Sequence, residues 1–300
     1  MMNYQIELPE YKKWLEKIWE KYKLDVEPFT QVVFTAFTPQ ELKELKYLGE
    51  LAAYAEFESV VRDIRKVNVF HLDPFDVDNQ LRKIINKGLV YYPIFRIKRF
   101  SGFAHKHTFA EEIDRDTVIY GVIAKNIEDA KKFDEASRKI PSDHTTIGKL
   151  LGYPECDIEF FNKYYHNPNY DLIPEIALNT KGVRVKEKIW DNGHSQIIIK
   201  VRGYPENNIL FRYCGIRIIP HFPHSFDCKE AREFGKKFFE LMKEKDERIA
   251  NLFYKILSDR IVWDAWKGVV EVRHGWIFCV SNTYPFKNRI TIIWENILND

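Results

Sequence analysis

Two histidines and a cysteine lie three to seven residues from one another in the stretch 220–228, which runs into a long helical pattern. Imidazole and thiolate together suit Zn²⁺ or another transition metal ion. The pattern predicts Ser225 as the helix N-cap, which places Cys228 in the first turn, where the helix dipole favours a thiolate. We therefore predict His221, His224 and Cys228 as metal ligands.

A second cysteine lies near the start of another predicted helix. Pro154 is typical of a helix start, so Cys156 and Asp157 fall in the first turn of a helix that begins at Glu155. If the 153–157 turn meets the 221–228 stretch, Cys156 or Asp157 becomes the fourth ligand, or Asp157 acts as the catalytic group beside a metal-bound water. His144 is the predicted partner in acid/base chemistry or in the second coordination sphere.

Other interpretations of these residues stay open. Without a metal, Cys156 and Cys228 could be nucleophiles with a histidine as base, or the histidines could be ordinary loop residues and Cys228 a small buried hydrophobe. The segment 145–165 also has the pattern of a helix-turn-helix, but the carboxylates at the start of its second helix oppose contact with DNA phosphates. A helical corner within an enzyme core explains this segment better.

Two further groups of polar residues are explained more simply as exposed loop residues than as functional sites. The alternating histidines of 105–107 could bind a metal, but an exposed loop pair explains them better. The carboxylates of 111–116 could form an acid/base pair, but charged loop residues in contact with water are the simpler account.

Composition narrows the class of protein. Of the 300 residues 45% are hydrophobic and 15% aromatic, which is typical of a packed globule. The 46 basic and 44 acidic residues give a net charge of +2, so overall charge does not indicate nucleic acid as a partner. No apolar run is long enough for a membrane span or a secretion signal, so we expect a cytoplasmic protein with reduced or metal-bound cysteines. Abundant Lys, Glu, Ile and Tyr suit a thermophile.

The hydrophobic pattern predicts an α+β fold, a mixed or antiparallel sheet packed with several helices, with a helical N-terminal region. Helices are predicted over 9–23, 38–66, 76–86, 126–138, 145–151, 155–165 and 226–257. Strands are predicted over 89–97, 117–124, 183–189, 195–202, 209–219, 268–281 (with a break at 274–275) and 289–295. The chain divides into regions 1–140 and 141–300, with a boundary near 138–145, or forms one continuous domain.

Three stretches of the sequence resemble a prokaryotic family of unknown function. The first two are GKLLGYPECD at 148–157 and HFPHSFDC at 221–228, which resemble that family's LGYP-x-CC and H-x-PCS-x-x-C motifs in the same order; the third is WDAWKGVVEV at 263–272. The resemblance covers about residues 118–295 and implies a site without naming a reaction.

This chain departs from the family motifs at two positions. Asp157 stands where the family has a second cysteine, and His224 stands where it has the cysteine of PCS. Both replacements are themselves metal-ligating residues, which favours a metal site with harder ligands and disfavours an iron–sulfur cluster.

Together these features predict a metal-dependent, Zn-like enzyme, with hydrolysis as its chemistry and a small molecule of unknown identity as substrate. The alternative is a non-catalytic protein whose structural zinc site supports nucleic-acid or protein binding. A homo-oligomer is compatible with either function.

Overall fold

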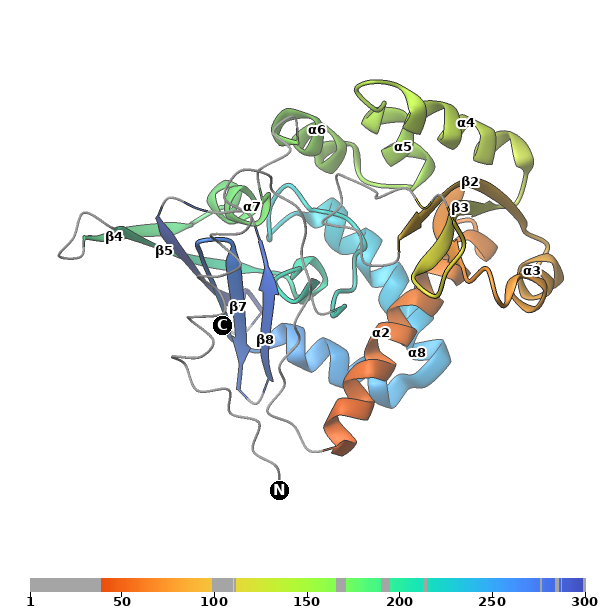
Figure 1. Ribbon diagram of the computed structural model, residues 1–300. Coiled ribbons are helices and arrows are strands. Elements are labelled where there is room, and N and C mark those ends of the chain that lie inside the picture. Colours follow the sequence, from red (N-terminus) through yellow and green to blue (C-terminus); the bar gives the residue numbers. More distant parts are fainter. Residues whose placement is uncertain are drawn as a thin grey trace.

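The computed structural model describes residues 39–98, 110, 112–165, 171–189, 195–212, 215–275, 277–283, 286 and 288–298. The chain has an α+β fold with one three-stranded sheet, one six-stranded sheet and helices between and around them (Figure 1). The predicted fold class is therefore confirmed. The predicted helix 9–23 and the histidines of 105–107 lie outside the described residues.

The smaller sheet is antiparallel in the order β1-β3-β2, and comprises β1 (Val67–Leu72), β2 (Val90–Lys98) and β3 (Thr117–Ala124). The central strand β3 is rich in β-branched residues and is buried over most of its length. One apolar cluster joins this sheet to α4 (Ile127–Arg138), and a second joins it to α3 (Val77–Asn86). The sheet is thus covered by helices on both faces.

The larger sheet has the order β4-β5-β9-β6-β7-β8, in which only the β5–β9 pair is parallel. Its strands are β4 (Arg184–Ile189), β5 (Ser195–Gly203), β6 (Ile261–Trp266), β7 (Val269–His274), β8 (Ile277–Asn282) and β9 (Arg289–Asn296). Residues of one face, among them Trp263 and Trp294, are fully buried in the main core. The period-two alternation of each strand directs these apolar side chains to the same side.

Two long helices lie side by side against this core: α2 (Pro39–Val61) and α8 (Lys229–Ser258) (Figure 1). Leu48 and Leu51 of α2 share the core with Phe238 and Met242 of α8. Asp246 leaves helical geometry within α8, and its carboxylate accepts from the backbone N–H of Ile249, so it caps the second part of the helix.

Three short helices lie between the two sheets in sequence: α5 (His144–Leu150), α6 (Glu155–Tyr164) and α7 (Ile173–Asn179). Asp143 caps α5 by accepting from the backbone N–H of Thr146, and Gly152 follows with a φ of 70°, as expected of a helix end. A Cβ on Gly152 would lie 2.8 Å from the carbonyl oxygen of Ile64. This tight turn sets the direction in which α6 begins.

Most predicted elements are present within two residues of their expected ends, including the break in the 268–281 segment between β7 and β8. The strand predicted over 209–219 is wrong. Ile209, Phe211 and Ile218 are buried as expected, but the described residues 209–212 and 215–219 form turns and irregular backbone, with Asn208 accepting from the N–H of Leu210. Strands β1 and β6 and helix α7 were not predicted.

Substitution of Gly203 on β5 tests how tightly the 221–228 stretch packs on the sheet. A Cβ on Gly203 would lie 2.5 Å from the Cβ of Phe226 and 2.6 Å from its carbonyl oxygen. We expect Gly203→Ala to lower the free energy of unfolding by about 1–3 kcal/mol, as overpacking does. Urea denaturation monitored by circular dichroism measures it.

Gly49 of α2 is the matched control, because apart from the helix's own backbone no atom of the described residues lies within 4 Å of a Cβ built there. Gly49→Ala should leave stability unchanged or raise it by up to about 1 kcal/mol, since alanine is the better helix former. Equal stability for Gly203→Ala and wild type would show that the loop does not press on the strand as described.

Candidate metal centre

Asp157 lies at the centre of the candidate site. It is in the first turn of α6 and is 2% exposed. Its Oδ2 lies 2.8 Å from Nε2 of His221, and its Oδ1 lies 2.9 Å from Nδ1 of His224. The backbone N–H of His224 also donates to Oδ1, at 2.7 Å. The carboxylate therefore joins the start of α6 to the loop before α8, which lies 64 or more residues later in the sequence.

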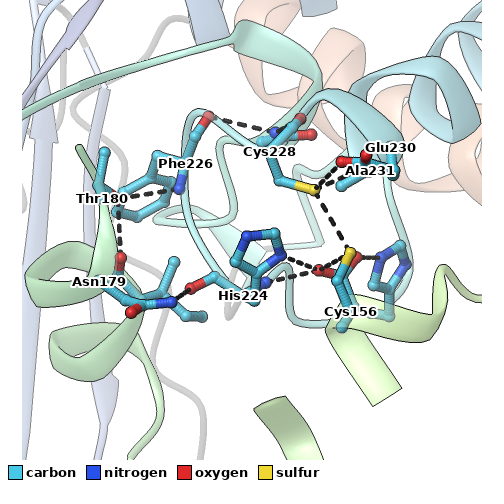
Figure 2. Close-up of polar contacts among 12 residues, drawn as sticks. Cys156, Asn179, Thr180, His224, Phe226, Cys228, Glu230 and Ala231 are labelled. Carbon is cyan, nitrogen blue, oxygen red and sulfur yellow. Dashed lines mark hydrogen bonds and ion pairs between the residues drawn. The ribbon is translucent and has the colours of Figure 1, made fainter. Parts of the chain in front are cut away.

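Two thiols lie close to each other beside this carboxylate, and Figure 2 shows them as Cys156 and Cys228. The Sγ atoms of Cys156 and Cys228 are 3.8 Å apart, and Sγ of Cys156 is 3.8 Å from Oδ1 of Asp157. One donor atom from each of Cys156, Asp157, His224 and Cys228 lies within 4.8 Å of the others. The predicted meeting of the 153–157 turn and the 221–228 stretch is thus present in the structure.

Hydrogen bonds to the backbone hold the loop that carries His224 and Cys228 (Figure 2). Thr180 Oγ1 accepts from the N–H of Phe226 at 3.0 Å, and Asn179 Nδ2 donates to the carbonyl of His224 at 2.8 Å. Asn207 Nδ2 donates to the carbonyls of Phe226 and Cys228 at 3.2 and 2.8 Å. These side chains come from α7 and from the 3₁₀ turn Pro205–Asn207, so the core determines the loop conformation.

Sequence reasoning missed these three supporting residues. Of the three, Asn207 lies in the polar stretch between the predicted strands 195–202 and 209–219, and the structure buries it at 0% exposure. A buried side-chain amide must have hydrogen-bond partners, and the backbone carbonyls of a neighbouring loop can provide them.

The start of α8 differs from the prediction. Cys228 itself is the N-cap, its Sγ lying 3.2 Å from the N–H of Ala231, whereas Ser225 lies in a turn before the helix. The helix begins at Lys229 because residues 225–228 already form a turn through the N–H of Cys228 and the carbonyl of Ser225. Cys228 is still at the positive end of the helix dipole, one position outside the helix.

The predicted thiolate character of the cysteines is wrong for the metal-free protein. Burial, and next the neighbouring Asp157 carboxylate, raise the pKa of Cys156 to about 11. The pKa of Cys228 is raised for the same two reasons. These effects exceed the contribution of the helix dipole, so both groups are thiols near neutral pH.

The histidines have the opposite effect on Asp157. Burial alone would raise the pKa of this carboxyl group, but hydrogen bonds from His221 and His224 outweigh it and lower the pKa to about 2. The same hydrogen bond raises the pKa of His224. Asp157 is therefore a carboxylate at neutral pH.

His221 lies behind the carboxylate and is outside the group of four donors. Its ring stacks on Tyr153 with the centroids 4.5 Å apart and meets Phe234 edge-on at 5.3 Å. Its Nε2 faces Asp157, and its buried Nδ1 has no hydrogen-bond partner among the described residues. The structure gives His221 the position of a residue that orients a ligand.

His144, predicted as an acid/base or second-sphere partner, is at the first position of α5. Its ring packs edge-on against Phe161 and Tyr165, with centroids 5.1 and 4.9 Å away. It is not among the residues of the four-donor group. The structure thus brings Cys156, Asp157, His224 and Cys228 together, places His221 next to them, and directs His144 toward aromatic rings.

The structure also bears on the state of the other cysteines and on the carboxylates of the 111–116 loop. Cys279 is disulfide-bonded, which contradicts the expectation that every cysteine is reduced or bound to metal, whereas Cys156 and Cys228 are free thiols. In the 111–116 loop, Asp114 pairs with Lys98 and accepts from Thr117 Oγ1, so it serves a local structural role.

Comparisons with known proteins add no assignment: no family model, curated protein or solved structure matches this chain. Among the described residues, no helix has both the length and the apolar character needed to cross a bilayer. The residues of the site are therefore the basis for its proposed chemistry.

The raised thiol pKa values predict that metal uptake releases protons. Because Cys156 and Cys228 both hold protons at pH 7.5, a metal that binds both must displace about two. The affinity should then increase with pH, by up to about 100-fold per pH unit for two protons. Titration calorimetry of ZnCl₂ in buffers of different ionisation enthalpy counts the protons, and a count near zero would contradict thiol coordination.

Proposed function

We propose that the protein binds Zn²⁺, or a similar transition metal ion, through Cys156, His224 and Cys228, and that it is a metal-dependent hydrolytic enzyme. The observation that supports this proposal is the convergence of two thiols, an imidazole and a carboxylate within 4.8 Å. Such a mixture of sulfur and nitrogen ligands suits zinc better than Mg²⁺ or Ca²⁺, which prefer oxygen.

The three ligands correspond to the Cys₂His set of a catalytic zinc site, whose fourth position takes water or substrate. A bound ion would supply Lewis acidity and lower the pKa of that water. The open position would face the same side as His224, because the side chain of His224 is 27% exposed, whereas the side chains of Asp157 and His221 are 1% and 4% exposed. Substrate would then approach from the side of His224.

Asp157 is the group proposed to orient the water. If His224 Nδ1 served as a ligand, Oδ1 of Asp157 would keep its hydrogen bond from the backbone N–H of His224, and Oδ2 would keep its contact with Nε2 of His221. Each carboxylate oxygen accepts more than one hydrogen bond, so capacity remains for a proton of the water. His221 acts on this step through Asp157 and is a positioning residue.

A second candidate function follows from Asp157 being in the four-donor group. If one of its oxygens is the fourth ligand, the site is closed by protein and is a structural zinc site. The ion would then fix the α6 start to the α8 start in a protein that binds nucleic acid or another protein. The two candidates differ in what Asp157→Asn does.

We also propose a cytoplasmic location and a thermophilic source for the protein. The two free thiols at the site suit a reducing cytoplasm, and the disulfide at Cys279 on β8 is compatible with an intracellular protein of a thermophile. Membership in the prokaryotic family with LGYP-x-CC and H-x-PCS-x-x-C motifs stays a prediction.

Substitution of the ligands tests the metal site. We expect protein purified without added metal to contain about one Zn²⁺ per chain, and Cys156→Ser, Cys228→Ser and His224→Gln each to weaken zinc binding by more than about 100-fold, the upper range for loss of a second-sphere partner. Elemental analysis and chelator competition measure it. His144→Gln is the matched control and should retain wild-type zinc, since its ring packs on Phe161 and Tyr165.

Asp157→Asn then separates the two candidates. The catalytic proposal expects zinc content within a few-fold of wild type and at least a 100-fold loss of kcat on the most reactive of a panel of chromogenic esters and phosphodiesters. A structural site expects loss of zinc and of thermal stability together. Zinc-replete protein that hydrolyses no member of the panel would contradict the catalytic function but leave the metal site intact.

A further inference from the structure

A row of cations lies on one face of the hairpin formed by β4 and β5. Arg184, Lys186 and Lys188 alternate along β4, so their side chains point to the same face, about 7 Å apart. Lys200 lies directly opposite Arg184 on β5 and shares that face. All four are exposed. The hairpin lies at one edge of the six-stranded sheet and extends away from the helices (Figure 1).

These cations have no neutralising partners in the described part of the chain. No ion pair there involves Arg184, Lys186, Lys188 or Lys200, although carboxylates pair with cations elsewhere on the same sheet, as Asp264 does with Arg289. Glu187, the one acidic residue of β4, points to the opposite face. The β4 end of the face therefore carries a concentrated positive charge that the net charge of +2 does not reveal. The carboxylates farther along the same face, Asp264, Glu271 and Glu295, each form an ion pair with an arginine.

The register of the sheet connects this charge to two aromatic rings. One line of paired residues crosses the sheet from Arg184 and Lys200 to Phe278 on β8; its members in order are Arg184, Lys200, Ile293, Val262, Arg273 and Phe278. A parallel line passes from Lys188 through Gln196 to Arg289, and Trp266 lies on the same face at the end of β6. Both rings are half-buried. Cations thus lie at one side of this face and aromatic rings at the other.

A second copy of the chain does not fit the exposed edge of β4. Antiparallel pairing of two β4 strands about a two-fold axis places Arg184 opposite Lys188 and Lys186 opposite itself, or Lys186 opposite Lys188. Every such register puts like charges directly across from one another, which is destabilising. The charge of this edge therefore favours an anionic partner over a second copy of the chain.

A lipid surface is the poorer anionic partner. Interfacial binding needs apolar side chains that enter the acyl region beside the cations. The exposed apolar residues of β4, Val185 and Ile189, point to the face opposite the cations. A linear polyanion lying across the sheet meets both the cations and the rings.

We propose that this face binds single-stranded nucleic acid, with phosphates on Arg184, Lys186, Lys188 and Lys200 and bases stacked near Trp266 and Phe278. Sheets that bind single strands combine a cationic surface for the backbone with aromatic rings for the bases. The inference is independent of the metal, since the residues concerned are not in the four-donor group.

Fluorescence anisotropy of the full chain with a labelled 20-nucleotide oligouridine and an oligothymidine tests the proposal. We expect K186Q/K188Q/K200Q to weaken binding at least tenfold at low salt. The slope of log affinity against log salt should fall by about 2, since each single-strand phosphate contact contributes about 0.7. The matched control is K131Q/K132Q/K237Q, three exposed lysines of α4 and α8, which should change affinity less than twofold.

A second variant distinguishes nucleic acid from other polyanions. Phe278→Leu should weaken oligonucleotide binding by about fivefold or more, in line with loss of one stacking contact, and leave binding of inorganic polyphosphate unchanged. Absence of oligonucleotide binding by the full chain, equal losses in both lysine triples, or binding only to vesicles containing anionic lipid would each overturn the proposal.

Discussion

The buried carboxylate of Asp157 is the interaction on which the candidate site depends. A charge in the interior is costly unless it is paired and hydrogen-bonded, and Asp157 meets this condition with two imidazoles and one backbone N–H. Those donors come from the loop before α8, whereas Asp157 belongs to α6. One side chain thereby brings Cys156 and Cys228, 72 residues apart in sequence, to a sulfur–sulfur distance of 3.8 Å.

The rest of the fold positions the two ends of this contact. The Gly152 turn directs α6, and Tyr153 provides the ring on which His221 stacks, while Arg65 donates to the hydroxyl of Tyr153. On the other side, Asn179, Thr180 and Asn207 hold the loop carbonyls and N–H groups. Residues from both sheets' connections are used, so the site is a product of the tertiary fold and cannot form from either segment alone.

Local patterns predicted much of this. Pro154 indicated the start of α6, and the density of Cys and His indicated the site residues. The patterns could not show that His221 lies behind Asp157, that His144 turns toward Phe161, or that burial raises the thiol pKa values, because each depends on neighbours distant in sequence. The apolar run 209–219 was predicted as a strand because buried turns and buried strands share composition. The cationic face appeared only when β4 and β5 were paired.

The central claim is that Cys156, Cys228 and His224 coordinate one metal ion, and X-ray absorption at the zinc edge of the stoichiometric zinc complex tests it most directly. The account predicts a first shell with two sulfur atoms at about 2.3 Å and nitrogen or oxygen atoms at about 2.0–2.1 Å, including imidazole scattering. A first shell of nitrogen and oxygen alone, with no sulfur, would contradict it.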